Sequence, residues 1–222
     1  MNKRVVYTCV TGGYENIVDP SFVQSDFDYV CFTDQTNTNS KVWSIRPIPD
    51  NLKDLSLVKQ QRIIKICPHL FLPQYTSSIY VDGSIDITGN LNDFLSKYCN
   101  SDKSVYIRRH PTRNCIYEEA VACINLKKDT ASNIESQMNR YASENYPSQN
   151  GLVESGVVYR HHNDLYCIRL MELWKNEVIK GSHRDQLSFN YCLWKVSDAG
   201  FQYVGLDLFN NPYFRWYGHH NR

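Results

Sequence analysis

Short apolar runs rich in β-branched and aromatic residues alternate along this chain with longer stretches of helical spacing, and several runs end in polar residues. This alternation constrains the fold more than any other feature, because strands separated by helices pair most readily in a mainly parallel sheet. We therefore predict an α/β domain with three layers around a mainly parallel central sheet. The expected strands cover residues 4–10, 28–34, 41–46, 78–82, 104–108, 156–160 and 201–204.

The intervening stretches carry helix signals at their ends. Pro68 is expected to end the first helix, Asn90 to cap the second and Gly181 to follow the fifth. Within the first helix, Arg62 and Lys65 share one face. The expected helices cover residues 54–67, 90–98, 115–125, 130–145, 163–179 and 184–196.

The length of 222 residues suits one domain, and we treat residues 1–222 as a single unit without repeats or linkers. Hydrophobic residues make up 42% and charged residues 21%, which excludes a disordered chain. The formal charge of +1 gives no electrostatic drive towards nucleic acid. No stretch approaches the roughly 20 apolar residues of a membrane-spanning helix. A peripheral membrane contact and the oligomeric state both stay open.

The 8 cysteines are scattered singly, without a C-x-x-C pair or a preceding signal peptide. We expect them to be reduced and mostly buried in a cytoplasmic protein. The histidines lack H-x-x-x-H spacing, so we expect no structural zinc. Residues 213–222 hold aromatic and basic side chains without an acid, which is typical of a packed strap or of a flap over an anionic ligand.

Two polar features stand at predicted strand ends. Gly12 and Gly13 fit neither the dinucleotide-binding nor the Walker spacing, so a plain turn and a base-binding loop both remain open. Asp82 ends an apolar strand, where an ionised carboxylate is costly unless it meets a cation or a polar ligand. Together with Arg62 and Lys65, it favours a site for a diphosphate and a divalent ion over a simple turn cap.

A family resemblance is carried by segments that span nearly the whole chain: VYTCVTGGY, DYVCFTD, KQQRIIKICPHLFLP, YVDGSIDI, RRHPTRNCIYEEA, LVESGVVYR and HRDQLSFNY. Taken in order, they resemble a nucleotide-sugar-dependent glycosyltransferase of the GT-A (Rossmann-like) fold. More narrowly, the chain resembles the plant mucilage-related (turgor-defect) glycosyltransferase-like domain family and its bacterial polysaccharide-locus relatives.

The resemblance implies a donor site at the strand ends. It places a uracil and ribose pocket after the first strand and a base-contacting acid after the second. Cations on the first helix would face the donor, and the metal and ribose motif D-x-D would follow the fourth strand. The residues that the resemblance assigns to the donor are Thr8, Thr11, Tyr14, Asp34, Arg62, Lys65, Asp82, Gly83 and Ser84.

The motif at the place of D-x-D reads D-G-S, so only Asp82 offers an ionised ligand there. Asp86 lies further along and is expected on the same face of the strand. Enzymes of the GT-A fold often close the metal site with a C-terminal histidine. The resemblance therefore implies Mn²⁺ or Mg²⁺ held by Asp82 and by His219 or His220.

The resemblance places Asp185 and Gln186 beside the reacting sugar carbon and Glu154 in the acceptor-side segment. Asp185 would act either as base on the acceptor hydroxyl, which gives inversion, or as a partner on the sugar face in a retaining reaction. An Asp in a first helical turn also suits the helix dipole. Acceptor contacts are expected from the loop and helix start that carry His110, Arg113 and Glu118.

The resemblance implies transfer of a sugar from a nucleoside diphosphate, with UDP favoured, to a hydroxyl of a saccharide acceptor in bacterial surface polysaccharide synthesis. A sugar-nucleotide hydrolase and a non-catalytic sugar-nucleotide-binding module remain as alternatives. A lipid-amide hydrolase activity, assigned to some plant relatives, ranks last because the chain has no zinc spacing and no G-x-S-x-G elbow.

Overall fold

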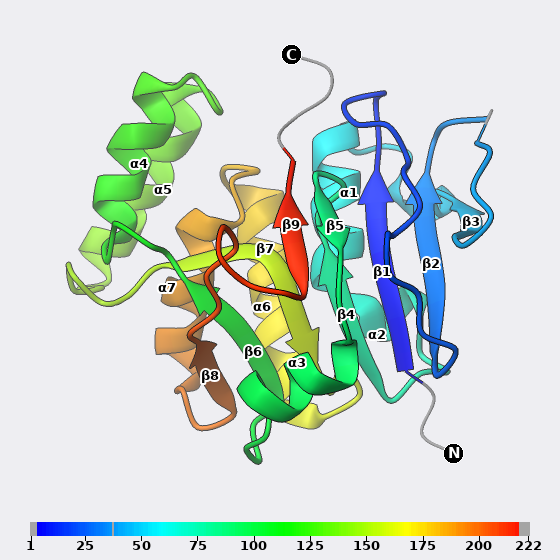
Figure 1. Cartoon of the computed structure of the whole chain (residues 1–222). Helices are drawn as coiled ribbons and strands as arrows, with labels where there is room; N and C mark the ends of the chain where they lie inside the picture. The colour runs from blue at the N-terminus through cyan, green and yellow to red at the C-terminus, as the bar shows by residue number, and fades with distance from the viewer. Residues whose placement is uncertain (1–3, 37, 218–222) are drawn as a thin grey trace.

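Seven strands form the central sheet in the order β3-β2-β1-β4-β7-β6-β8 in the computed structural model, which describes residues 4–36 and 38–217 (Figure 1). All of these strands run in one direction except β7, which is antiparallel to both neighbours. The predicted α/β class with a mainly parallel sheet is confirmed. The sheet consists of β1 (Arg4–Val10), β2 (Phe27–Thr33), β3 (Ser44–Pro47), β4 (Ser77–Val81), β6 (Val105–Arg109), β7 (Val153–Arg160) and β8 (Phe201–Val204).

Helices cover one face of this sheet, and a smaller layer covers the other (Figure 1). The first face packs against α1 (Leu57–Ile66), α2 (Pro68–Phe71), α6 (Leu165–Lys180) and α7 (Gln186–Val196). On its far side, α7 contacts α4 (Ile116–Asn125), which packs against α5 (Ala131–Ser143). The other face carries α3 (Leu91–Tyr98) and an antiparallel pair of short strands, β5 (Ile85–Ile87) and β9 (Phe214–Trp216). A single 3-10 turn, Asp50–Leu52, precedes α1.

Local signals explain where the helices begin. The Ser56 and Asn90 side chains accept hydrogen bonds from backbone N–H groups in the first turns of α1 and α3. Pro68 follows α1 as expected, but it also opens the short helix α2, because a first helical position needs no N–H donor. In the tail, residues 214–216 form β9, so the strap alternative describes this part of the chain. His219 and His220 lie outside the described residues.

The core consists of two apolar layers, one on each side of the sheet. All eight cysteines are buried and none forms a disulfide, as predicted. Within the core, the fully buried Arg160 donates from Nη1 to the carbonyl oxygens of Lys65 (2.8 Å) and Ile66 (3.0 Å) at the end of α1. Tyr7 in β1 also donates to the Lys65 carbonyl (2.6 Å). These bonds fix the helix turn that presents the Lys65 side chain.

Among the described residues, no helix has the length and apolar character needed to span a bilayer.

Candidate active site

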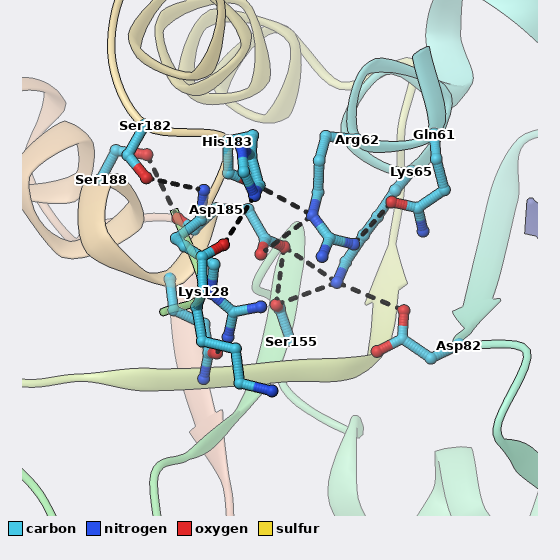
Figure 2. Close-up of polar contacts among 12 residues, drawn as sticks. Gln61, Arg62, Lys65, Asp82, Lys128, Ser155, Ser182, His183, Asp185 and Ser188 are labelled. Atoms are coloured by element: carbon cyan, nitrogen blue, oxygen red, sulfur yellow. Dashed lines mark hydrogen bonds and ion pairs between the residues drawn. The ribbon is translucent and has the colours of Figure 1, made fainter. Parts of the chain in front are cut away.

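Charged side chains converge where β4 ends and β7 begins. Asp82 directly follows β4, and its N–H donates to the carbonyl of Gly156 in β7 (2.9 Å). Arg62 and Lys65 come from α1, and Asp185 immediately precedes α7 (Figure 2). Sequence positions more than a hundred residues apart therefore meet at one edge of the sheet, the usual place for ligands in open α/β folds.

Lys65 is the centre of this cluster. Its ammonium nitrogen lies 2.9 Å from Asp185 Oδ2 and 3.5 Å from Asp82 Oδ1. It also donates to Ser155 Oγ (3.0 Å), and that hydroxyl in turn donates to Asp185 Oδ2 (2.9 Å). Lys65 thus joins the two carboxylates that the sequence places at separate strand and helix ends.

Asp185 is held by both its side chain and its backbone. Arg62 Nε lies 3.5 Å from Oδ1, and the buried Trp174 indole donates to the Asp185 carbonyl (2.9 Å). Burial alone would raise the pKa of the Asp185 carboxyl, but Lys65 and Arg62 outweigh it, so the pKa lies well below its usual value. The carboxylate is ionised across the physiological range and is a weak base.

Asp82 is held by side chains that sequence reasoning missed. Tyr80 donates its hydroxyl to Asp82 Oδ1 (2.8 Å), and Gln61 Nε2 donates to the Tyr80 oxygen (2.7 Å). Arg62 donates to Gln61 Oε1 (2.5 Å) and closes the network. Strand periodicity places Tyr80 on the Asp82 face, two residues away, and was the available signal for it.

The cluster has a buried end and an accessible end. The side chains of Lys65 and Asp185 are 2% and 3% exposed, whereas those of Arg62 and Asp82 are 17% and 32% exposed. A ligand arriving from solvent therefore meets Arg62 and Asp82 first. The two cations and two carboxylates balance in charge, so a bound diphosphate adds negative charge that these four groups do not neutralise.

A divalent ion fits at Asp82 through one oxygen. Oδ1 is engaged by Tyr80 and Lys65, which leaves Oδ2 for a metal. Mg²⁺ sites often combine one or two carboxylates with substrate phosphates and water. The oxygens of Asp86 accept from Ser21 N–H (2.9 Å) and from Arg215 (3.1 Å), so Asp86 braces β5 against β9 instead of joining Asp82.

The expectation that Asp86 lies with Asp82 on one continuous strand is wrong. The N–H of Ile85 donates to the carbonyl of Asp82 (2.9 Å), which makes a turn at Gly83 and Ser84 and separates β4 from β5. Ser84 is buried within this turn, and the Tyr217 hydroxyl donates to the Gly83 carbonyl (3.1 Å).

A small cavity adjoins Thr8, one of the residues predicted to line the uracil and ribose pocket. Its volume is about 20 Å³, and it also adjoins Asp82, Gly83 and Tyr217. It has room for about one water molecule and none for a nucleobase. Thr8 Oγ1 is buried beside it without a hydrogen-bond partner among the described residues.

The other donor residues shape the loop after β1. Thr11 donates to the Leu57 carbonyl (3.0 Å), which ties the loop to α1. Asp34 accepts from the N–H of Gly12 (2.9 Å), whose φ of 69° favours glycine. Tyr14 is half exposed. In this arrangement Asp34 and Thr11 stabilise the conformation of the loop after β1.

The side chains of Glu154 and Gln186 contact residues outside the charged cluster. Glu154 pairs with Arg108 of β6, and the strand alternation puts it on the face opposite Ser155. Gln186 donates to the Val153 carbonyl (2.9 Å) and accepts from Arg184 (3.2 Å).

The predicted acceptor residues are divided between two clusters. Arg113 Nε lies 2.6 Å from Glu119 Oε2, and the Arg113 N–H donates to His110 Nδ1 (3.0 Å). Glu118 instead accepts from Gln149 (2.6 Å) at the exposed surface. The buried Glu119 is the partner of Arg113 in this loop, and it was not among the predicted site residues.

The fold is of a structural class that solved glycosyltransferases share. It is similar to the apo structure of the bifunctional glycosyltransferase WbbM, with a TM-score of 0.52 and 9% identity over 90% of this chain. The chain spans 38% of the WbbM chain. It is also similar to apo mouse xyloside xylosyltransferase 1, with a TM-score of 0.51 and 10% identity over 93% of this chain and 86% of that one.

Sequence comparison assigns the chain to one family. A family model described as TOD1/MUCI70, glycosyltransferase-like domain matches residues 2–218, and the chain belongs to this family. A comparison with curated proteins gives no match. The family resemblance drawn from the sequence segments is therefore confirmed.

Proposed function

We propose that this protein transfers a sugar from a nucleoside diphosphate donor, with UDP favoured, to a hydroxyl group of a saccharide acceptor. The observation that carries the proposal is the Lys65 ammonium between Asp82 and Asp185, 3.5 and 2.9 Å away, with Arg62 on the accessible side. Membership of a glycosyltransferase-like family supports this assignment. The proposed setting is bacterial surface polysaccharide synthesis in the cytoplasm, on the strength of the resemblance alone.

In the proposed reaction, the bond between the sugar's anomeric carbon and the diphosphate oxygen breaks, and a bond to the acceptor oxygen forms. The proton of the acceptor hydroxyl passes to the departing diphosphate or to solvent. Negative charge develops on the departing diphosphate, and Arg62 and Lys65 stabilise it there. The low pKa of Asp185 makes it a poor acceptor of the hydroxyl proton. We assign Asp185 the task of holding both cations in place. Inversion and retention both remain open.

A divalent ion, Mn²⁺ or Mg²⁺, belongs to the proposal. Asp82 would hold it through Oδ2, and His219 or His220 would supply a further ligand. When bound, the ion supplies positive charge at the diphosphate, which the balanced cluster of Arg62, Lys65, Asp82 and Asp185 lacks. We also propose that the acceptor contacts the region of His110, Arg113 and Glu118.

Calorimetry tests the donor site directly. UDP and GDP are titrated into metal-stripped protein with and without Mn²⁺, and the titrations are repeated with Asp82→Ala. We expect UDP to bind more tightly with Mn²⁺ and the metal-dependent gain to disappear in the variant. Absence of binding by either nucleotide in the wild-type protein would refute the proposal.

The alternatives predict different products. A sugar-nucleotide hydrolase would cleave the donor rapidly without any acceptor, whereas a binding module would bind the donor and leave it intact with every acceptor. Donor turnover that depends on an added saccharide is the outcome expected of a transferase. Chromatography of the nucleotide and sugar products separates the three cases.

A further inference from the structure

Away from the active site, three side chains with metal-binding atoms gather where α1, α2 and α6 meet. Cys67 joins α1 to α2, His69 lies in α2, and Glu172 lies in α6. One sulfur, one ring nitrogen and one carboxylate oxygen of these residues all lie within 4.8 Å of one another. In residues 4–36 and 38–217, no other group of three such side chains meets this criterion.

The state of His69 is a second, independent observation. Nε2 lies 2.9 Å from Glu172 Oε1, while Nδ1 is buried with no hydrogen-bond partner among the described residues. The His69 side chain is 6% exposed. When Nε2 donates to Glu172, Nδ1 keeps a lone pair, and a neutral imidazole of this kind is the form that binds metals.

The remaining contacts of these residues would change when a metal binds. The side chain of Glu172 is 36% exposed, whereas Cys67 is fully buried and its Sγ donates to the Met171 carbonyl (3.9 Å). Lys175 contacts Glu172 from the next turn of α6 and would have to move aside. The flexible stem of a lysine makes this displacement inexpensive.

We propose that Cys67, His69 and Glu172 form a site for one zinc ion, with water as the fourth ligand. A thiolate, an imidazole and a carboxylate are ligands that zinc accepts together, whereas Mg²⁺ and Ca²⁺ prefer oxygen alone. On binding, the S–H bond of Cys67 breaks, a sulfur–zinc bond forms, and the proton passes to the buffer. The sequence expectation of no structural zinc rested on H-x-x-x-H spacing, which this set of residues does not use.

A metal bound at this site would stabilise the two helices that position the charged side chains of the candidate active site. α1 carries Arg62 and Lys65, and α6 carries Trp174, which holds the Asp185 backbone. A metal that joins the end of α1 to α6 therefore fixes the two helices whose side chains position the charged cluster. The site is separate from the proposed Mn²⁺ or Mg²⁺ position at Asp82.

Cobalt, which replaces zinc and absorbs light, tests the site. Metal-stripped full-length protein is titrated with Co²⁺. We expect a near-ultraviolet thiolate-to-cobalt band that saturates at one ion per chain and that Zn²⁺ abolishes. Cys67→Ser should lose the band. Cys99→Ser, which changes a buried cysteine on the other face of the sheet, should keep it.

A second variant covers the case in which Cys67→Ser fails to fold. Glu172→Gln changes a partly exposed side chain, and we expect it to weaken Co²⁺ binding at least tenfold while its folding matches the wild type. Absence of a thiolate band in the wild-type protein would overturn the proposal. A band that persists in Cys67→Ser, or unchanged affinity in Glu172→Gln, would overturn it equally.

Discussion

At the scale of single residues, the buried ion pair between Lys65 and Asp185 dominates the candidate site. Both side chains are almost inaccessible, and each provides the charge that compensates the other. Removing one member of such a pair costs more than the intact pair contributes, because the other charge stays buried. Stability and activity therefore depend on the same contact, and experiments have to separate them.

We predict that Asp185→Asn lowers the free energy of unfolding by about 3 kcal/mol, because the buried Lys65 keeps only the more distant carboxylate of Asp82. Turnover should fall by orders of magnitude, since Lys65 and Arg62 lose their anchor. Urea denaturation and a transfer assay measure the two effects. Adding Lys65→Met should restore part of the stability without restoring turnover. Unchanged stability in Asp185→Asn would show that the pair is not buried as described.

Arg62 lies at the accessible end of the cluster, so its loss should act on the donor. We predict that Arg62→Ala weakens UDP binding by about 10- to 100-fold, which corresponds to about 1.4–2.8 kcal/mol. Lys59→Ala is the matched control, because Lys59 lies on the same helix but donates to the Ile179 carbonyl (2.7 Å). Calorimetry compares both variants with the wild type. Equal losses in the two would remove the assignment of Arg62.

At the scale of secondary-structure elements, β7 passes close to β5 beside Asp82, and Gly156 lies at this close approach. A Cβ atom at Gly156 would lie 2.9 Å from Ile85 Cδ1 and 3.5 Å from Asp82 Oδ2. The first distance is too short for a real contact, so Ile85 must shift, whereas the second is an ordinary van der Waals distance. A methyl group here therefore displaces Ile85 at the start of β5, three residues after Asp82.

We predict that Gly156→Ala costs about 1 kcal/mol of stability and weakens UDP binding in the presence of Mn²⁺ about tenfold. Gly205→Ala is the control, because a Cβ there meets nothing within 4 Å. Adding Ile85→Val to Gly156→Ala removes the crowding methyl and should recover much of the affinity. Titrations that show the same affinity for Gly156→Ala and the wild type would contradict the claim that donor binding at Asp82 needs the space beside Gly156.

Local signals explain why much of this architecture could be predicted from the sequence. Asn90 caps its helix, and the apolar run before Asp82 forms its strand, because both depend on neighbouring residues. The reversed direction of β7 and the pairing of β5 with β9 depend on contacts between distant segments. Ser155 was missed as a site residue for the same reason, since only the packing of α1 and α7 against β7 brings it to Lys65.

At the scale of the whole molecule, buried histidines make stability depend on pH. Burial lowers the pKa of His162 to about 4, helped by the nearby charge of Arg160 and by His69, while the Leu72 carbonyl (3.1 Å from Nε2) opposes the shift. The usual value is about 6.5, so the unfolded chain binds a proton that the folded chain does not between these values. Stability must therefore fall as the pH decreases from about 6.5 towards 4. Protonation of Asp185 lowers stability only at lower pH, because the pKa of this carboxyl lies below the usual value of about 3.9.

We predict that lowering the pH from 7.5 to 5 removes about 2 kcal/mol of stability through His162 alone. Four other histidines, His69, His110, His161 and His183, also have lowered pKa values and add losses in the same direction. Urea denaturation at both pH values should therefore show a larger loss in the wild type than in His162→Gln, whose amide can replace Nε2 but does not titrate. Because the other histidines are common to both proteins, the difference between the two losses isolates His162. Equal losses would mean that His162 is already protonated in the folded protein at pH 5.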